Sequence, residues 1–172
     1  MDEIEAVIRS QPQLEDTDRQ ILSRLAQRRA WLATTHPVDS GDLSHLEQQV
    51  LHGDYQETNL FFKDEKISAI IDWDQSYVAP RAWEIVRTLH YALNLEEVFC
   101  RAFLDAYRRV LPLMQAELEV AATAYGWKRA HDLWQYEELY LKGNQRVRAF
   151  FQPNERFVPF AERWAMLQQL LL

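Results

Sequence analysis

One β-hairpin pattern, between residues 59 and 72, constrains the fold of this chain more than any other feature of its sequence. Residues 59–62 and residues 66–72 are largely apolar, and the polar turn Lys63-Asp64-Glu65 joins them. Two such segments separated by a short polar turn predict an antiparallel hairpin. No other segment shows a convincing strand pattern, so we expect one small hairpin in an otherwise helical protein.

Apolar residues recur at helical spacing through most of the remaining sequence. The first third predicts a helix that Asp16 or Thr17 caps. After Pro80, further helices are predicted over residues 81–93, 95–111 and 114–125, from about residue 128, and up to residue 172. Gly126 is expected to end the third of them. We therefore expect a mainly α (α+β) fold, organised as a single domain over residues 1–172.

Composition disfavours several classes of protein. Every apolar run is short and interrupted by charge, well below the ~20 residues of a membrane span. The net charge of −7 disfavours nucleic acid as a partner, because phosphate contacts need clustered Lys and Arg. The same charge would suit a cationic small substrate, although ordinary solubility is the simpler explanation. The single cysteine, Cys100, excludes an internal disulfide and suggests a cytoplasmic protein.

The strongest chemical signal is the segment His52-Gly53-Asp54-Tyr55-Gln56-Glu57-Thr58-Asn59. An aspartate follows the histidine by two residues, an asparagine follows five residues later, and Asp72 comes 13 residues after Asn59. This is the spacing of a kinase catalytic loop, after which a hairpin delivers a metal-binding aspartate. The structural alternative is a turn capped by His52, with Asn59 unrelated to it.

Phosphoryl transfer explains why these residue types are needed. An attacking hydroxyl must lose its proton, so a carboxylate must lie beside it, and Asp54 is placed for that role. Mg²⁺ neutralises the charge of the transferred phosphate and takes oxygen ligands, which Asn59 and Asp72 can provide. We therefore expect these three side chains to converge in space.

The pattern His-Gly-Asp-x-x-x-x-Asn followed by Ile71-Asp72-Trp73-Asp74 resembles the aminoglycoside phosphotransferase and choline kinase family. Gly53 stands where protein kinases usually have arginine, and Glu84 stands where the family commonly has aspartate. The resemblance is specific over roughly residues 50–89. It implies a protein-kinase-like C-terminal lobe, helical except for one small hairpin after the catalytic loop.

The same resemblance implies roles for individual residues. Asp54 would be the catalytic base, and His52 would belong to the catalytic loop mainly as its brace. Asn59 and Asp72 would bind Mg²⁺, with Asp74 as a lesser candidate for the metal. ATP would be the co-substrate.

A complete kinase of this type also has an N-terminal lobe, whose Gly-rich loop and lysine hold ATP. The 53 residues before Asp54 contain no lysine and no Gly-x-Gly pattern. We therefore expect the C-terminal lobe only, with the nucleotide-binding lobe absent and little ATP turnover by this chain alone. The partners expected are a small hydroxylated substrate and either a second copy of the chain or a partner that supplies the lobe.

Two functions remain open from the sequence. The first is the catalytic C-terminal lobe of an ATP-dependent phosphotransferase that phosphorylates a hydroxyl of an aminoglycoside-like molecule, an amine or a sugar. The second is a catalytically inactive kinase-like lobe that serves as a binding module. Cys100 is expected to be a buried structural residue. Asp132, Glu137 and Glu138 are expected to form a solvated face, with a cation-binding role as the alternative.

Overall fold

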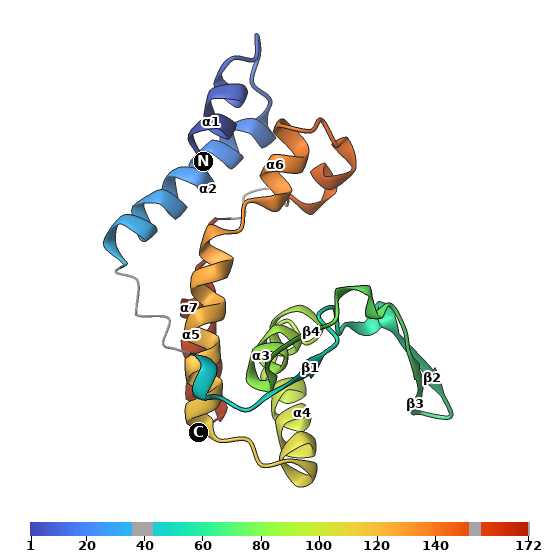
Figure 1. The fold of residues 1–172 in the computed structure, drawn as a ribbon. Helices are drawn as coiled ribbons and strands as arrows, with labels where there is room; N and C mark the ends of the chain where they lie inside the picture. The colour runs from blue at the N-terminus through green and yellow to red at the C-terminus, as the bar shows by residue number, and fades with distance from the viewer. Residues whose placement is uncertain (36–42, 152–155, 172) are drawn as a thin grey trace. The chain divides into compact units, whose positions relative to one another are not determined.

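The computed structural model describes residues 1–35, 43–151 and 156–171 (Figure 1). The chain forms two compact units, one helical and one that combines helices with strands. Two compact units are not by themselves two domains, so the single domain expected over residues 1–172 stays a prediction. The candidate site lies entirely in the second unit.

The first unit consists of helices. They are α1 (Asp2–Arg9), α2 (Asp16–Thr34) and α6 (Trp134–Tyr140), and a 3₁₀ helix over Gln145–Phe150 follows α6. The N-cap of α2 is Glu15, one residue before Asp16, the first of the two predicted caps, and its backbone N–H donates to the Asp18 carboxylate at 2.8 Å. The apolar faces of these helices share a core of Ile4, Ile8, Ile21, Leu25, Tyr136, Leu139 and Val147.

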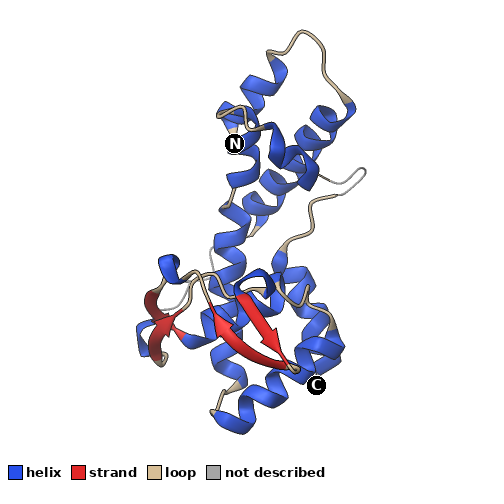
Figure 2. Cartoon of the chain, turned by 90° about the vertical axis from the view of Figure 1, so that its right-hand side faces the viewer, coloured by secondary structure: helices blue, strands red, loops and turns tan. Residues whose placement is uncertain are grey.

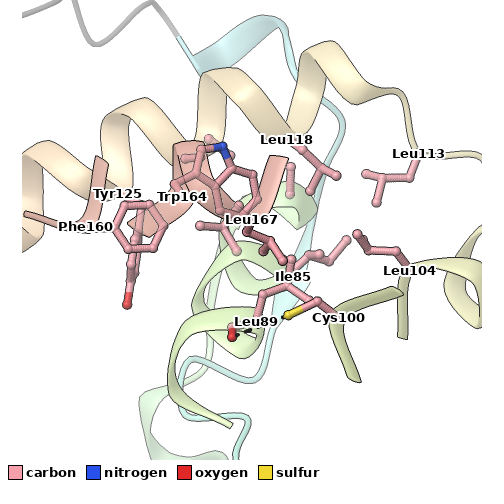
Figure 3. Close-up of a cluster of buried hydrophobic side chains, with 14 residues drawn as sticks. Ile85, Leu89, Cys100, Leu104, Leu113, Leu118, Tyr125, Phe160, Trp164 and Leu167 are labelled. Atoms are coloured by element: carbon pink, nitrogen blue, oxygen red, sulfur yellow. Dashed lines mark hydrogen bonds between the residues drawn. The ribbon is translucent and has the colours of Figure 1, made fainter. Parts of the chain in front are cut away.

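Four helices build the core of the second unit. They are α3 (Arg81–Tyr91), α4 (Glu97–Val110), the first part of α5 (Gln115–His131) and α7 (Phe160–Leu171). Figure 3 shows their side chains meeting, with Leu89, Cys100 and Leu118 almost completely buried. Each leucine buried in this way contributes about 1.5–3 kcal/mol. Burial also raises the pKa of the Cys100 thiol to about 11, as expected for a structural cysteine.

The second unit also contains the predicted hairpin, formed by β2 (Leu60–Lys63) and β3 (Lys66–Ile70). The two strands are antiparallel (Figure 2). Asp64 and Glu65 form the turn, and both have positive φ angles, 50° and 60°. Two-residue turns with positive φ match the twist of the flanking strands, so a tight turn is possible here without glycine.

A second antiparallel pair was not predicted. β1 (Gln48–Leu51) pairs with β4 (Tyr77–Pro80), and Val50 lies opposite Val78. The prediction of a single hairpin is therefore incomplete. Each of these strands is only four residues long, and the motif and the whole hairpin separate them along the chain, so no local pattern announces their pairing.

Gly126 does not end a helix as predicted, because α5 continues through it to His131. A Cβ at position 126 would lie 3.0 Å from Cδ1 of Phe160, so glycine allows α7 to approach α5 closely. Residues 128–131 consequently belong to α5, and the next helix begins only at Trp134.

Helices predominate and the strands form only short antiparallel pairs, so the predicted mainly α (α+β) class is confirmed. Among the described residues, no helix combines the length and the apolar character that crossing a membrane requires. The His-Gly-Asp segment begins directly after β1, the hairpin follows it, and α3 follows β4. These elements of one unit position the candidate site.

Candidate active site

The His-Gly-Asp segment forms a tight loop between β1 and β2. Its second residue, Gly53, has a φ of 82°. A Cβ at this position would lie 2.1 Å from the backbone oxygen of Gln75. Only glycine combines this backbone angle with such a close approach, so the local geometry explains the glycine of the motif.

Glu84 of α3 fixes the backbone of the same loop. Its Oε2 accepts a hydrogen bond from the His52 N–H at 2.9 Å, and its Oε1 accepts one from the Gly53 N–H at 2.5 Å. Hydrogen bonds to an ionised carboxylate are about twice as strong as neutral ones. The sequence marked Glu84 only as a position where the family commonly has aspartate, so its anchoring contact is a finding of the structure.

His52 is 3% exposed and uses both ring nitrogens within the protein. Nδ1 lies 3.2 Å from the backbone nitrogen of Asp54, and Nε2 lies 2.7 Å from the carbonyl oxygen of Ile71. Because the Asp54 N–H can only donate, Nδ1 accepts, and Nε2 carries the proton that is donated to Ile71. These contacts connect the loop to the segment after β3, which is the geometry of a brace.

The structure brings Asp54 and Asn59 into direct contact. The Asn59 Nδ2 group donates to the Asp54 backbone oxygen at 2.8 Å and to Asp54 Oδ2 at 3.1 Å. Both partners are acceptors, so the amide nitrogen must face them and Asn59 Oδ1 must point the other way. No described residue donates a hydrogen bond to that Oδ1, so it has no protein partner among the described residues, although Asn59 as a whole is 7% exposed.

The residue before Asp72 is joined to Asn59 by a backbone hydrogen bond. The N–H of Ile71 donates to the Asn59 carbonyl oxygen at 3.0 Å, so residue 72 follows a segment that is tied to the loop. Asp72 itself has a left-handed backbone, φ 63° and ψ 60°, and its side chain is exposed. Residues other than glycine rarely adopt this conformation, and such outliers cluster at functional sites.

Asp74 lies in the short 3₁₀ helix Trp73–Gln75, and its side chain is exposed. Neither Asp72 nor Asp74 forms a hydrogen bond or ion pair with another side chain in the part of the chain that the structure describes. Direct side-chain contact therefore joins Asp54 to Asn59, whereas the convergence of Asp72 with them and the metal role of Asp74 stay predictions.

Two further contacts on Asp54 were not predicted. Gln56 Nε2 donates to Asp54 Oδ2 at 2.9 Å, and the guanidinium of Arg87 forms an ion pair with Asp54 Oδ1. Arg87 lies three residues after Glu84 on α3, so both side chains extend from one face of that helix. That spacing is the only sequence signal that could have placed Arg87 in the site.

Two tyrosines border the loop region without adding charge to it. Burial raises the pKa of the Tyr55 and Tyr77 hydroxyls, and the negative charge of Glu84 adds to the effect. Both hydroxyls therefore stay neutral near pH 7. Aspartate, glutamate and Arg87 supply the charge around the loop.

Comparison with known proteins agrees with this geometry. The model of the phosphotransferase enzyme family matches residues 3–123 of the 172-residue chain, which include the loop, the hairpin and α3. No curated protein and no solved structure was found to match. Because the family model covers more than half of the chain, the resemblance seen in the motif is confirmed, and the chain belongs to the phosphotransferase enzyme family.

Proposed function

We propose that this chain is the C-terminal catalytic lobe of an ATP-dependent phosphotransferase that phosphorylates a hydroxyl group of a small molecule. The observation that carries the proposal is the paired geometry of Asp54 and Asn59. One carboxylate is held in place by three donor groups, and the amide oxygen of its neighbour is left for a ligand. A base beside an oxygen donor for a cation is the arrangement that phosphoryl transfer needs.

In the proposed reaction, Asp54 accepts the proton of the acceptor hydroxyl. The O–H bond breaks as the acceptor oxygen forms a bond to the γ-phosphorus of ATP. The bond from that phosphorus to the bridging oxygen breaks, and its electron pair leaves with ADP. His52 and Glu84 contribute indirectly, because they hold the loop that carries Asp54.

The oxygen donors of this site suit Mg²⁺. This ion prefers oxygen ligands and usually takes only one or two protein carboxylates, with phosphates and water completing its shell. The candidate protein ligands are Asn59 Oδ1 and the Asp72 carboxylate, with Asp74 as a lesser candidate. Within residues 1–35, 43–151 and 156–171, no three His, Cys, Asp or Glu side chains form a metal-binding group by themselves. When bound, Mg²⁺ supplies positive charge against the phosphate oxygens.

The remaining parts of the proposal concern the substrates. ATP is held by a Gly-rich loop and a lysine in phosphotransferases of this kind, and a nucleotide-binding lobe would supply them. The acceptor is an aminoglycoside-like molecule, an amine with a hydroxyl group or a sugar, and the net charge of −7 favours a cationic one. The reaction would take place in the cytoplasm, where ATP is present.

A phosphoryl-transfer assay tests the proposal. The purified chain is mixed with radiolabelled ATP, Mg²⁺ and a panel of aminoglycosides, hydroxylated amines and sugars, with and without a Gly-rich nucleotide-binding lobe of this family. We expect a labelled phosphoester of at least one acceptor when the lobe is present, much less with the chain alone, and none after chelation of Mg²⁺. Failure to label any acceptor in either arrangement would contradict the proposal.

A second candidate function, a binding module without catalysis, is favoured by one observation. Val50 of β1 and Val78 of β4 face each other in register and are 65% and 67% exposed. Phe61 and Phe62 of β2 are also exposed. Exposed apolar side chains in such numbers are typical of interaction surfaces. Association through these residues together with no acceptor labelling would support this candidate.

A further inference from the structure

We propose that Arg87 is a positioning residue, which orients the Asp54 carboxylate so that one oxygen lone pair of Oδ1 faces the acceptor hydroxyl. The inference rests on the proposed function, because it specifies how the base of that reaction is held. Neither the motif nor the family match assigns a role to Arg87, which lies in α3 outside the His-Gly-Asp loop.

The hydrogen bonds of the Asp54 carboxylate identify the oxygen that accepts the proton. Each carboxylate oxygen has two lone pairs that can accept hydrogen bonds. Oδ2 receives two donors, the Nε2 group of Gln56 and the Nδ2 group of Asn59. Oδ1 receives one, from Arg87, and no other described residue donates to it. The remaining lone pair therefore lies on Oδ1, beside the Arg87 contact.

Arg87 is itself held in place. Its guanidinium carbon lies 5.1 Å from the ring centroid of Tyr91, one helical turn further along α3. Its Nη1 lies 3.5 Å from the carbonyl oxygen of Tyr55, at the limit of a hydrogen bond. The Arg87 side chain is 18% exposed. A guanidinium stacked on an aromatic ring has a defined orientation, so it can impose one on its partner.

α3 thus contacts both the backbone of the loop and one of its side chains. Glu84 holds the backbone of His52 and Gly53, and Arg87 holds the Asp54 side chain. Without Arg87, only the two donors to Oδ2 hold the carboxylate, no described side chain fixes Oδ1, and its lone pair loses its defined direction. Base catalysis depends on that alignment, because misplacement by about 1 Å can cost a factor of 10² in rate.

The side-chain amide of Asn59 reports the orientation of Asp54 without any turnover. Its ¹H–¹⁵N NMR signal can be assigned by its loss in Asn59→Asp, and Asp54→Ala shows where it moves when the carboxylate acceptor is removed. We expect Arg87→Gln to move the signal toward the Asp54→Ala position and Arg87→Lys to move it less. The control Arg101→Gln removes a different ion pair of the same unit, between Arg101 and Glu97, and should leave the signal unchanged. A folded Arg87→Gln protein with an unmoved Asn59 signal would overturn the inference.

Kinetics provide the second measurement, made on the assembly that labels an acceptor. We expect Arg87→Ala to lower kcat about 10- to 100-fold while KM for the acceptor stays within about twofold. Added guanidinium ion at low millimolar concentration should restore part of the lost kcat, whereas a purely structural role for Arg87 gives no such rescue. An unchanged kcat would also refute the inference. If no acceptor is labelled by the wild type, the proposed function fails, and the Asn59 signal still decides whether Arg87 orients Asp54.

Discussion

Replacing Asp54 with asparagine is expected to lower phosphoryl transfer to the acceptor by about 10²–10⁴-fold, the usual contribution of a general base. Asparagine has nearly the same shape as aspartate, but its amide group cannot take the proton of a hydroxyl at neutral pH. The charge of the ion pair with Arg87 is lost as well, and its two side chains are only 18% and 27% exposed. The amide oxygen of the asparagine can still accept a hydrogen bond from Arg87, so the free energy of unfolding should fall by about 1–3 kcal/mol.

Asp64→Asn is the matched control for this variant. It makes the same chemical change in the exposed turn between β2 and β3, where a φ of 50° suits asparagine equally well. Initial rates of acceptor labelling should stay near the wild-type value in Asp64→Asn and collapse in Asp54→Asn, while urea unfolding shows both proteins folded. Equal rates in the two variants would remove Asp54 from the mechanism.

Gly53→Ala is expected to produce the largest loss of stability among single substitutions in the loop. The new Cβ would lie 2.1 Å from the Gln75 carbonyl oxygen and 2.8 Å from its carbonyl carbon. Neither is a flexible side-chain atom, so the backbone must move. The positive φ adds about 1–2 kcal/mol and the steric overlap about 1–3 kcal/mol. We therefore expect the free energy of unfolding to fall by about 2–5 kcal/mol.

Gly143→Ala separates the two causes. Gly143 also has a positive φ, 69°, but a Cβ there meets nothing within 4 Å among the described residues. Only the backbone strain of about 1–2 kcal/mol should appear in this variant. Urea denaturation of both proteins measures the difference directly. A Gly53→Ala protein as stable as Gly143→Ala would mean that the loop is not packed against Gln75 as described.

Local sequence patterns predicted the parts of the fold that depend on neighbouring residues. The hairpin was predicted correctly because two apolar segments and a polar turn lie within 14 residues, from 59 to 72. The β1–β4 pair was missed because its strands are short and distant in sequence. Gly126 was wrongly predicted to end a helix, because glycine ends many helices. In the structure it lies within α5 and makes room for the Phe160 side chain of α7. Tertiary contacts decide such cases, and a single sequence does not contain them.

The same distinction applies to the site. Asp54 and Asn59 lie five residues apart, so the loop spacing was enough to predict that they meet. Arg87 is 33 residues from Asp54, and its contact depends on how α3 packs against the loop. Glu84 was predictable only in part. The family pattern indicated an acidic residue at this position, but not that it accepts hydrogen bonds from the backbone of the loop. Contacts that cross between elements were therefore the ones that the sequence left undetermined.

Asn59 and Asp72 are proposed to belong to one metal site beside Asp54, and binding of Mn²⁺ in place of Mg²⁺ tests this most directly. Mn²⁺ broadens the NMR signals of nearby nuclei, so titration of the ¹⁵N-labelled chain maps the site. We predict weak binding, in the millimolar range, that broadens the Asn59 side-chain amide and the backbone amides of Ile71 and Trp73 together, and that Asp72→Ala abolishes. Broadening confined to other acidic residues, such as Asp64 and Glu65, or broadening at Asn59 that persists in Asp72→Ala, would contradict the account.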